Sequence, residues 1–170
     1  LIDGVEVMNG SSFYPLAIDW AHEGKLFVSS NTDIHDATAE TYRINGVRRN
    51  MTLIFAKDQS VESLREAIAA RRTLAYSLGT LAGDEALLRD LFLASMQMRV
   101  VAEASNGVKT VALTNMSSVA YVLRYGSGNP VVINPFSTRT AKTNKEGVLR
   151  FTVENMWCSS DAHPVIEVRP

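Results

Sequence analysis

The pattern of apolar residues changes near residue 96, and this change limits the folds open to the chain. Residues 1–95 alternate short apolar runs with segments of helical periodicity, whereas residues 96–170 carry short strand-like runs between turn residues. The first pattern is typical of α/β packing, and the second is typical of a β-sandwich or small barrel. We therefore expect an α/β domain over residues 1–95 and a small, sandwich-like all-β domain over residues 96–170.

The expected elements of the first half follow from periodicity and helix capping. Strands are expected at residues 1–7, 26–28, 51–56 and 73–76, and helices at residues 15–23, from Ser60 to Arg72, and from Asp84 to Phe92. The unbroken apolar run Met51–Ala56 predicts burial on both faces, as in a parallel sheet. Strands in the second half are expected at Met96–Ala104, Lys109–Thr114, Ala120–Tyr125, Pro130–Ile133, Ser137–Ala141, Gly147–Val153 and Pro164–Val168.

Charge and composition exclude some classes of partner. The 17 Lys and Arg residues balance 18 Asp and Glu residues, so nothing in the net charge of -1 indicates nucleic acid or an anionic membrane as partner. No apolar segment has the length of a membrane-spanning helix, and the single Cys158 cannot form an intramolecular disulfide. The chain begins at Leu1, inside an apparent strand, so we expect a piece of a longer protein and leave its compartment open.

The best candidate for chemistry is the polar segment that follows the predicted strand at residues 26–28. In an extended segment, the side chains of Asp33 and His35 would point to the same side of the backbone. A carboxylate and an imidazole at the carboxyl end of a strand form half of a Zn²⁺, Mn²⁺ or Fe site. The spacing alone favours the plainer interpretation, an Asp that turns the loop beside a solvated His.

Other candidates have simpler structural explanations. The same triplet recurs at Asp161 and His163, where no buried strand leads into it, so we expect a turn. Nothing around Cys158 predicts a stabilised thiolate. His22 and the pair Arg71-Arg72 are expected at helix C-termini, where the helix dipole favours cations.

Six stretches of residues 1–95 occur in an order that resembles one enzyme family. They are Gly4–Asn9, Phe13–Pro15, Asn31–His35, Arg49–Asp58, Glu62–Ala67 and Ala70–Tyr76. This ordered set resembles the final third of a PHP (polymerase and histidinol phosphatase) domain, a metal-dependent phosphoesterase built on a distorted α/β barrel. The pattern is most similar to a two-domain, phosphodiesterase-like subgroup in which a small β-domain follows the barrel, so residues 96–170 would be that β-domain.

The resemblance implies roles for four residues. Asp33 and His35 match the last metal-binding motif of the family, which takes divalent ions such as Zn, Mn or Fe. Asn9 and Arg49 fall in family-like stretches and would contact a small phosphate-ester substrate. The family's earlier ligands, including an H-x-H motif, are absent from the 170 residues, so the upstream half of the same PHP domain would be the partner that supplies them.

The function implied by the resemblance is hydrolysis of a phosphodiester or phosphomonoester by metal-activated water. We expect the 170 residues alone to be inactive, and they could lack bound metal. The residues also leave a second class open, in which the chain is a non-catalytic binding or docking module with a β-sandwich interaction domain. An H-x-H motif upstream of Leu1 would favour the enzyme, and its absence would favour the module.

Overall fold

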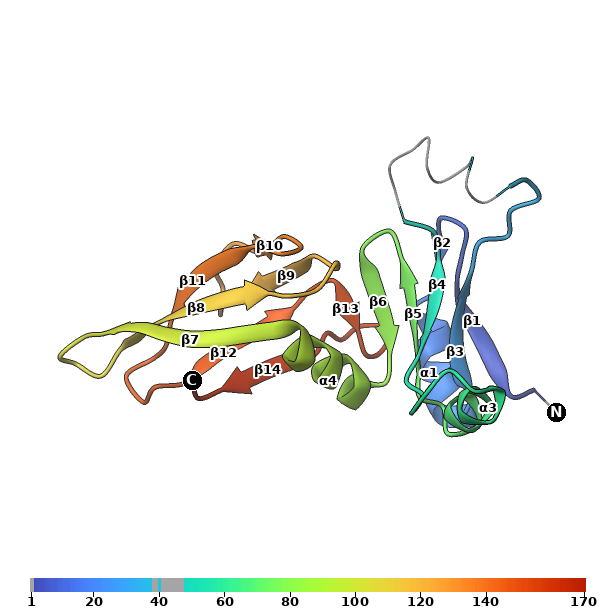
Figure 1. The fold of residues 1–170 in the computed structure, drawn as a ribbon, viewed down its shortest axis with the longest axis horizontal. Helices are drawn as coiled ribbons and strands as arrows, with labels where there is room; N and C mark the ends of the chain where they lie inside the picture. Colours follow the sequence, from blue (N-terminus) through green and yellow to red (C-terminus); the bar gives the residue numbers. More distant parts are fainter. Residues whose placement is uncertain (1, 38–39, 41–47) are drawn as a thin grey trace. The chain divides into compact units, whose positions relative to one another are not determined.

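A computed structural model of the chain describes residues 2–37, 40 and 48–170. The chain forms two compact units, shown as a ribbon in Figure 1. Unit 1 consists of Leu1–Leu88 together with Met156–Ala162, and unit 2 consists of Arg89–Asn155 together with His163–Pro170. The division into a domain of residues 1–95 and a domain of residues 96–170 remains a prediction. No helix in the described part of the chain is long and apolar enough to cross a membrane.

The first sheet of unit 1 contains a parallel strand pair joined by a helix. Its strands are β1 (Gly4–Asn9), β2 (Ser12–Phe13) and β3 (Phe27–Asn31), and β1 lies between the other two. Strand β3 is parallel to β1, and α1 (Leu16–Gly24) connects them. The buried face of α1 packs with both strands in one apolar cluster, formed by Val7, Met8, Ala17, Ile18, Ala21, Val28, Ala75 and Ala82.

The second sheet of unit 1 has the strand order β13-β6-β5-β4. Its strands are β4 (Met51–Ile54), β5 (Thr73–Ser77), β6 (Thr80–Gly83) and β13 (Met156–Trp157). Helix α3 (Val61–Ala69) connects β4 to β5, and α4 (Glu85–Ser95) follows β6. The β4–β5 and β5–β6 pairs are antiparallel, whereas β13 pairs parallel to β6.

The expectation of an α/β barrel fragment is wrong, because most of the regular secondary structure of the described residues lies in four small β-sheets. A barrel requires β4 and β5 to run parallel, but these strands pair antiparallel although α3 separates them. A tight turn with Leu78 and Gly79 both at positive φ then joins β5 to β6, as in a two-residue hairpin. The run Met51–Ile54 also differs from the expectation, since none of its residues is fully buried.

Side-chain hydroxyls join the two sheets of unit 1 along β3. The Thr73 hydroxyl accepts a hydrogen bond from the Val28 N–H at 3.1 Å and donates to the Val28 carbonyl at 2.8 Å. The Thr52 hydroxyl accepts from the Ser30 N–H at 3.0 Å and donates to the Ser30 carbonyl at 3.3 Å. On this edge of β3, the N–H and carbonyl groups of Val28 and Ser30 therefore form hydrogen bonds with side-chain hydroxyls and not with the backbone of a neighbouring strand.

Unit 2 is built from antiparallel strands in two sheets, which fits the expected β-sandwich. One sheet has the order β10-β9-β12-β14 and the other the order β11-β8-β7. The strands are β7 (Met96–Glu103), β8 (Lys109–Asn115), β9 (Tyr121–Arg124), β10 (Val131–Ile133), β11 (Thr138–Lys142), β12 (Leu149–Val153) and β14 (Val165–Val168). The Phe92 ring packs against Tyr121 and Phe151, with ring centroids 5.0 and 5.4 Å apart, at the centre of this core.

Replacement of Thr73 by Val tests the hydroxyl bridge. The side chain keeps its shape, but the buried N–H and carbonyl of Val28 lose their partner, so we expect a loss of about 3 kcal/mol in the free energy of unfolding. Urea denaturation measures this change. Thr140→Val, at an exposed position of β11, is the matched control and should change the free energy by less than about 0.5 kcal/mol. Equal effects of the two substitutions would contradict the bridge.

Candidate active site at the end of β3

Parallel pairing brings the carboxyl ends of β1 and β3 to the same edge of the first sheet. Asn9 and Asn31 are partners in this register and lie at that edge. Gly10 has a φ of 56° and turns the chain after β1, and its N–H donates to the Asn31 carbonyl at 3.0 Å. The end of β3 is thus fixed to the turn that follows Asn9, at the kind of sheet edge where open α/β proteins bind ligands.

Two side chains from distant segments hold the Gly10 turn in place. The Gly10 carbonyl accepts hydrogen bonds from the Asn50 side-chain amide at 2.9 Å and from the Ser77 hydroxyl at 3.3 Å. Asn50 is only 5% exposed, whereas its neighbour Arg49 is exposed. The structure therefore brings Asn9 and Arg49 to the same turn, because each precedes one partner of the Gly10–Asn50 bond.

Arg49 lines a hollow of about 440 Å³ next to the end of β3. The other lining residues come from the end of β3 and from β4 with the residue before it: Ser30, Asn31, Thr32, Asn50, Met51, Thr52 and Leu53. Asn31 and Thr32 lead directly into Asp33. A ligand in this hollow could contact an amide, hydroxyls and a guanidinium, a set that suits an anion such as phosphate.

Asp33 and His35 follow Asn31, and both are exposed. Asp33 has a φ of 48°, so the backbone leaves the extended conformation there, and the alternation of side chains along a strand cannot be used to align it with His35. The pair offers two ligands at most, and no group of three or more His, Cys, Asp or Glu side chains within the described residues could hold a metal ion. The described residues therefore do not complete a zinc-type site, and metal binding by Asp33 and His35 remains a prediction.

Asn50, Gly10 and Ser77 organise this edge, but no sequence motif marks them as functional. Asn50 lies 40 residues from Gly10 in the sequence and Ser77 lies 67 residues from it, so no local pattern connects them. The one sequence feature that points to Asn50 is its position as a polar residue between Arg49 and the apolar run that begins at Met51.

The chain was compared with known proteins. No family model matches it, and no curated protein matches it. One solved structure is similar over 99% of this chain, with 26% sequence identity and a TM-score of 0.89. It is a two-domain protein from Bacteroides vulgatus that contains a predicted PHP-like metal-dependent phosphoesterase, and this chain spans about half of it, 52% of its length.

The similarity supports the PHP resemblance in its general form, and metal dependence and phosphoesterase activity are the described properties of the similar protein. It is also consistent with a chain that corresponds to the C-terminal part of such a protein.

Cys158 lies elsewhere in unit 1, and its surroundings disfavour a nucleophile. Burial, and then the nearby Glu85 carboxylate, raise the pKa of the Cys158 thiol. A raised pKa leaves less of the reactive thiolate at neutral pH. The neighbouring segment forms the expected turn, in which the Ser159 hydroxyl donates to the Asp161 carboxylate at 2.8 Å.

Alkylation by iodoacetamide tests the state of Cys158. At neutral pH we expect the thiol to react more slowly than glutathione, and its rate should keep rising at a pH where glutathione has levelled off, because the thiolate forms later. Glu85→Gln removes a negative neighbour, so it should lower the pKa and speed alkylation, whereas Glu62→Gln on α3 should leave the rate unchanged. A neutral-pH rate equal to that of glutathione would contradict this interpretation.

Proposed function

We propose that the chain is part of a PHP-type metal-dependent phosphoesterase, in which Asp33 and His35 are two of the metal ligands. The similarity to the Bacteroides vulgatus protein over 99% of this chain carries the proposal. The exposure of both side chains beyond the end of β3 supports it, since neither is packed into the apolar core. The metal would be Zn, Mn or Fe, which accept carboxylate and imidazole ligands.

Asn9 and Arg49 are proposed to contact the phosphate-ester substrate. Arg49 is exposed on the hollow beside Asn31, and a guanidinium can bind two phosphate oxygens at once. Asn9 lies at the same edge and could donate from its amide. The Gly10 turn fixes the backbone next to both residues, so they are held with the small spatial variation that substrate binding requires.

The 170-residue chain alone is proposed to be inactive. Asp33 and His35 supply fewer ligands than a catalytic zinc site uses, and the similar protein is about twice as long. The remaining ligands would come from the rest of the PHP domain, upstream of this chain.

Manganese titration of the 170-residue chain tests the ligand pair directly. We expect paramagnetic Mn²⁺ to broaden the amide NMR signals around Asp33 and His35 first. Asp33→Asn should weaken Mn²⁺ binding, as followed by this broadening, by about tenfold because a charged ligand is lost. Asp161→Asn is the matched control, since it changes the same Asp-x-His triplet in a turn. Broadening around Asp161 but not around Asp33 would contradict the assignment.

Hydrolysis assays test the rest of the proposal. With Mn²⁺ or Zn²⁺ present, the 170-residue chain should not hydrolyse bis(p-nitrophenyl) phosphate or p-nitrophenyl phosphate above the buffer rate. A longer protein that carries the upstream residues should hydrolyse at least one of them, and Arg49→Gln in that protein should raise KM more than it lowers kcat. Hydrolysis by the 170-residue chain would refute the proposal that it is inactive alone. A longer protein that neither binds metal nor hydrolyses either ester would favour the docking module.

A further inference from the structure

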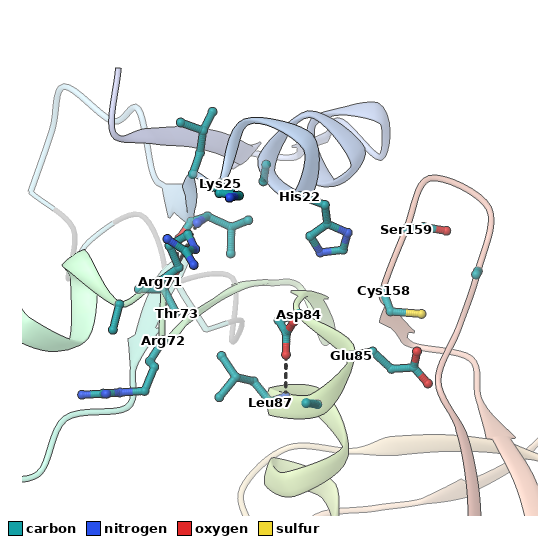
Figure 2. A pocket seen from close by; sticks show the side chains of 16 residues that line it. His22, Lys25, Arg71, Arg72, Thr73, Asp84, Glu85, Leu87, Cys158 and Ser159 are labelled. Carbon is teal, nitrogen blue, oxygen red and sulfur yellow. Dashed lines mark hydrogen bonds between the residues drawn. The ribbon is translucent and has the colours of Figure 1, made fainter. Parts of the chain in front are cut away.

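A second cavity of unit 1 has a volume of about 730 Å³, and Figure 2 shows it from close by. It is lined by Val28 near the start of β3, at the opposite end of that strand from Asn31. Val28 and Thr73, near the starts of β3 and β5, line it, whereas Ser77 at the far end of β5 bonds to the Gly10 turn. Its other walls are the ends of α1 and α3, the start of α4 and the segment that carries Cys158 and Ser159. The cavity is therefore distinct from the hollow beside Arg49.

Helix α1 ends at this cavity with a cation in a conformation that usually belongs to glycine. Lys25 has a φ of 52°, its N–H donates to the His22 carbonyl at 3.3 Å, and the Leu26 N–H donates to the Ala21 carbonyl at 2.8 Å. This paired arrangement is a common helix end, but glycine is the usual residue at the left-handed position because it has no Cβ.

Helix α3 ends in the same way at the same cavity. Arg71 has a φ of 58°, and its N–H donates to the Ile68 carbonyl at 2.9 Å, while the Arg72 N–H donates to the Ala67 carbonyl at 2.9 Å. Two helices thus end with a basic residue in place of glycine, and both basic residues line one cavity. Backbone strain that is retained at two such positions motivates a search for a function.

The charges of Lys25 and Arg71 are available to a ligand. Within the part of the chain that the structure describes, neither side chain has an ion pair or hydrogen bond. Arg72 differs, because it binds the Glu66 carboxylate and donates to the Phe55 carbonyl at 3.0 Å. Lys25 and Arg71 also line an adjoining cavity of about 570 Å³ with a third cation, Arg65, and one carboxylate, Asp3.

The far wall of the cavity has the opposite character. Asp84 and Glu85 at the start of α4 are acidic, and Figure 2 shows Glu85 beside Cys158, away from Lys25 and Arg71. Asp84 accepts from the Leu87 N–H at 3.1 Å as a helix cap. Aliphatic groups of Ala21, Leu26, Val28 and Ala70 also line the cavity. The cavity thus pairs a basic wall with an acidic one, and its volume is typical of small-molecule sites.

We propose that this cavity binds a small phosphate monoester, with Lys25 and Arg71 holding the phosphate and Glu85 accepting hydrogen bonds from hydroxyl groups of the remainder. An ammonium and a guanidinium are the usual protein partners of phosphate. This binding site is additional to the proposed phosphoesterase site and does not depend on it, since no residue lines both.

The alternative explanation is that the two cations only stabilise the helix C-termini through the helix dipole. Lys25→Gly and Arg71→Gly separate these explanations. Glycine removes the cation but suits the left-handed backbone, so a ligand site predicts weaker phosphate binding with an unchanged or higher Tm. A purely structural role of the charges predicts a lower Tm and no change in phosphate binding.

The experiment is an NMR titration of the 170-residue chain with inorganic phosphate and with glycerol phosphate. We expect shifts at residues 22–26, 70–73 and 84–87, tighter binding of the ester, and about tenfold weaker binding in each glycine variant. Glu85→Gln should weaken binding of glycerol phosphate but not that of inorganic phosphate. Arg139→Gln, at an exposed position of β11, is the control and should change neither. Arg49→Gln distinguishes binding in this cavity from binding at the end of β3.

Three results would overturn the proposal. They are the absence of shifts at these residues with about 10 mM phosphate, binding that the glycine variants leave intact, and binding that Arg49→Gln abolishes. The last result would place the phosphate at the end of β3 and so would support the proposed phosphoesterase site while refuting this one. Loss of the shifts in the Lys25→Gly and Arg71→Gly chains alone would support the cavity whatever the outcome of the hydrolysis assays.

Discussion

The arrangement of unit 1 depends on how the backbone N–H and carbonyl groups on one edge of β3 find hydrogen-bond partners. On the other edge, β3 pairs with β1, and on this one the hydroxyls of Thr52 and Thr73 both accept from and donate to the backbone. A hydroxyl can do both at once, so one side chain replaces the two groups of a neighbouring strand. These hydroxyl bonds allow the antiparallel β4–β5–β6 sheet to lie beside the parallel β1–β3 pair without backbone hydrogen bonds to β3. They also place β5 so that Ser77 lies beside the Gly10 turn.

Local features of this fold could be read from the sequence, but strand direction could not. The Ser60 side chain accepts from the Ser63 N–H, and the Asp84 side chain caps α4, as the capping pattern predicts. The antiparallel pairing of β4 with β5 cannot be predicted from the sequence, because a strand–helix–strand order occurs with either strand direction. The β5–β6 hairpin has no clear sequence signal, because Leu78 occupies a left-handed position that usually carries asparagine, aspartate or glycine.

The candidate site divides in the same way. The short segment Asn31–His35 could be singled out, since a buried strand followed by polar residues is a local signal. The contacts that organise its surroundings join Gly10 to Asn50 and Ser77, and only the fold brings them together. The helix dipole accounts for Arg71 at the end of α3, and no sequence motif marks Lys25 at the end of α1. Only the tertiary structure brings these two cations to one cavity.

The return of Met156–Trp157 to unit 1 means that neither unit is a continuous stretch of sequence. Strand β13 covers the outer edge of β6, and the Trp157 ring packs edge-on against Phe13 with centroids 5.4 Å apart. A polypeptide that stopped before residue 156 would leave that edge open to strands of other molecules and would lose an aromatic contact. Ribosomal synthesis must therefore pass through most of the β-rich region before unit 1 can close, which delays its completion until residues 156–162 have emerged.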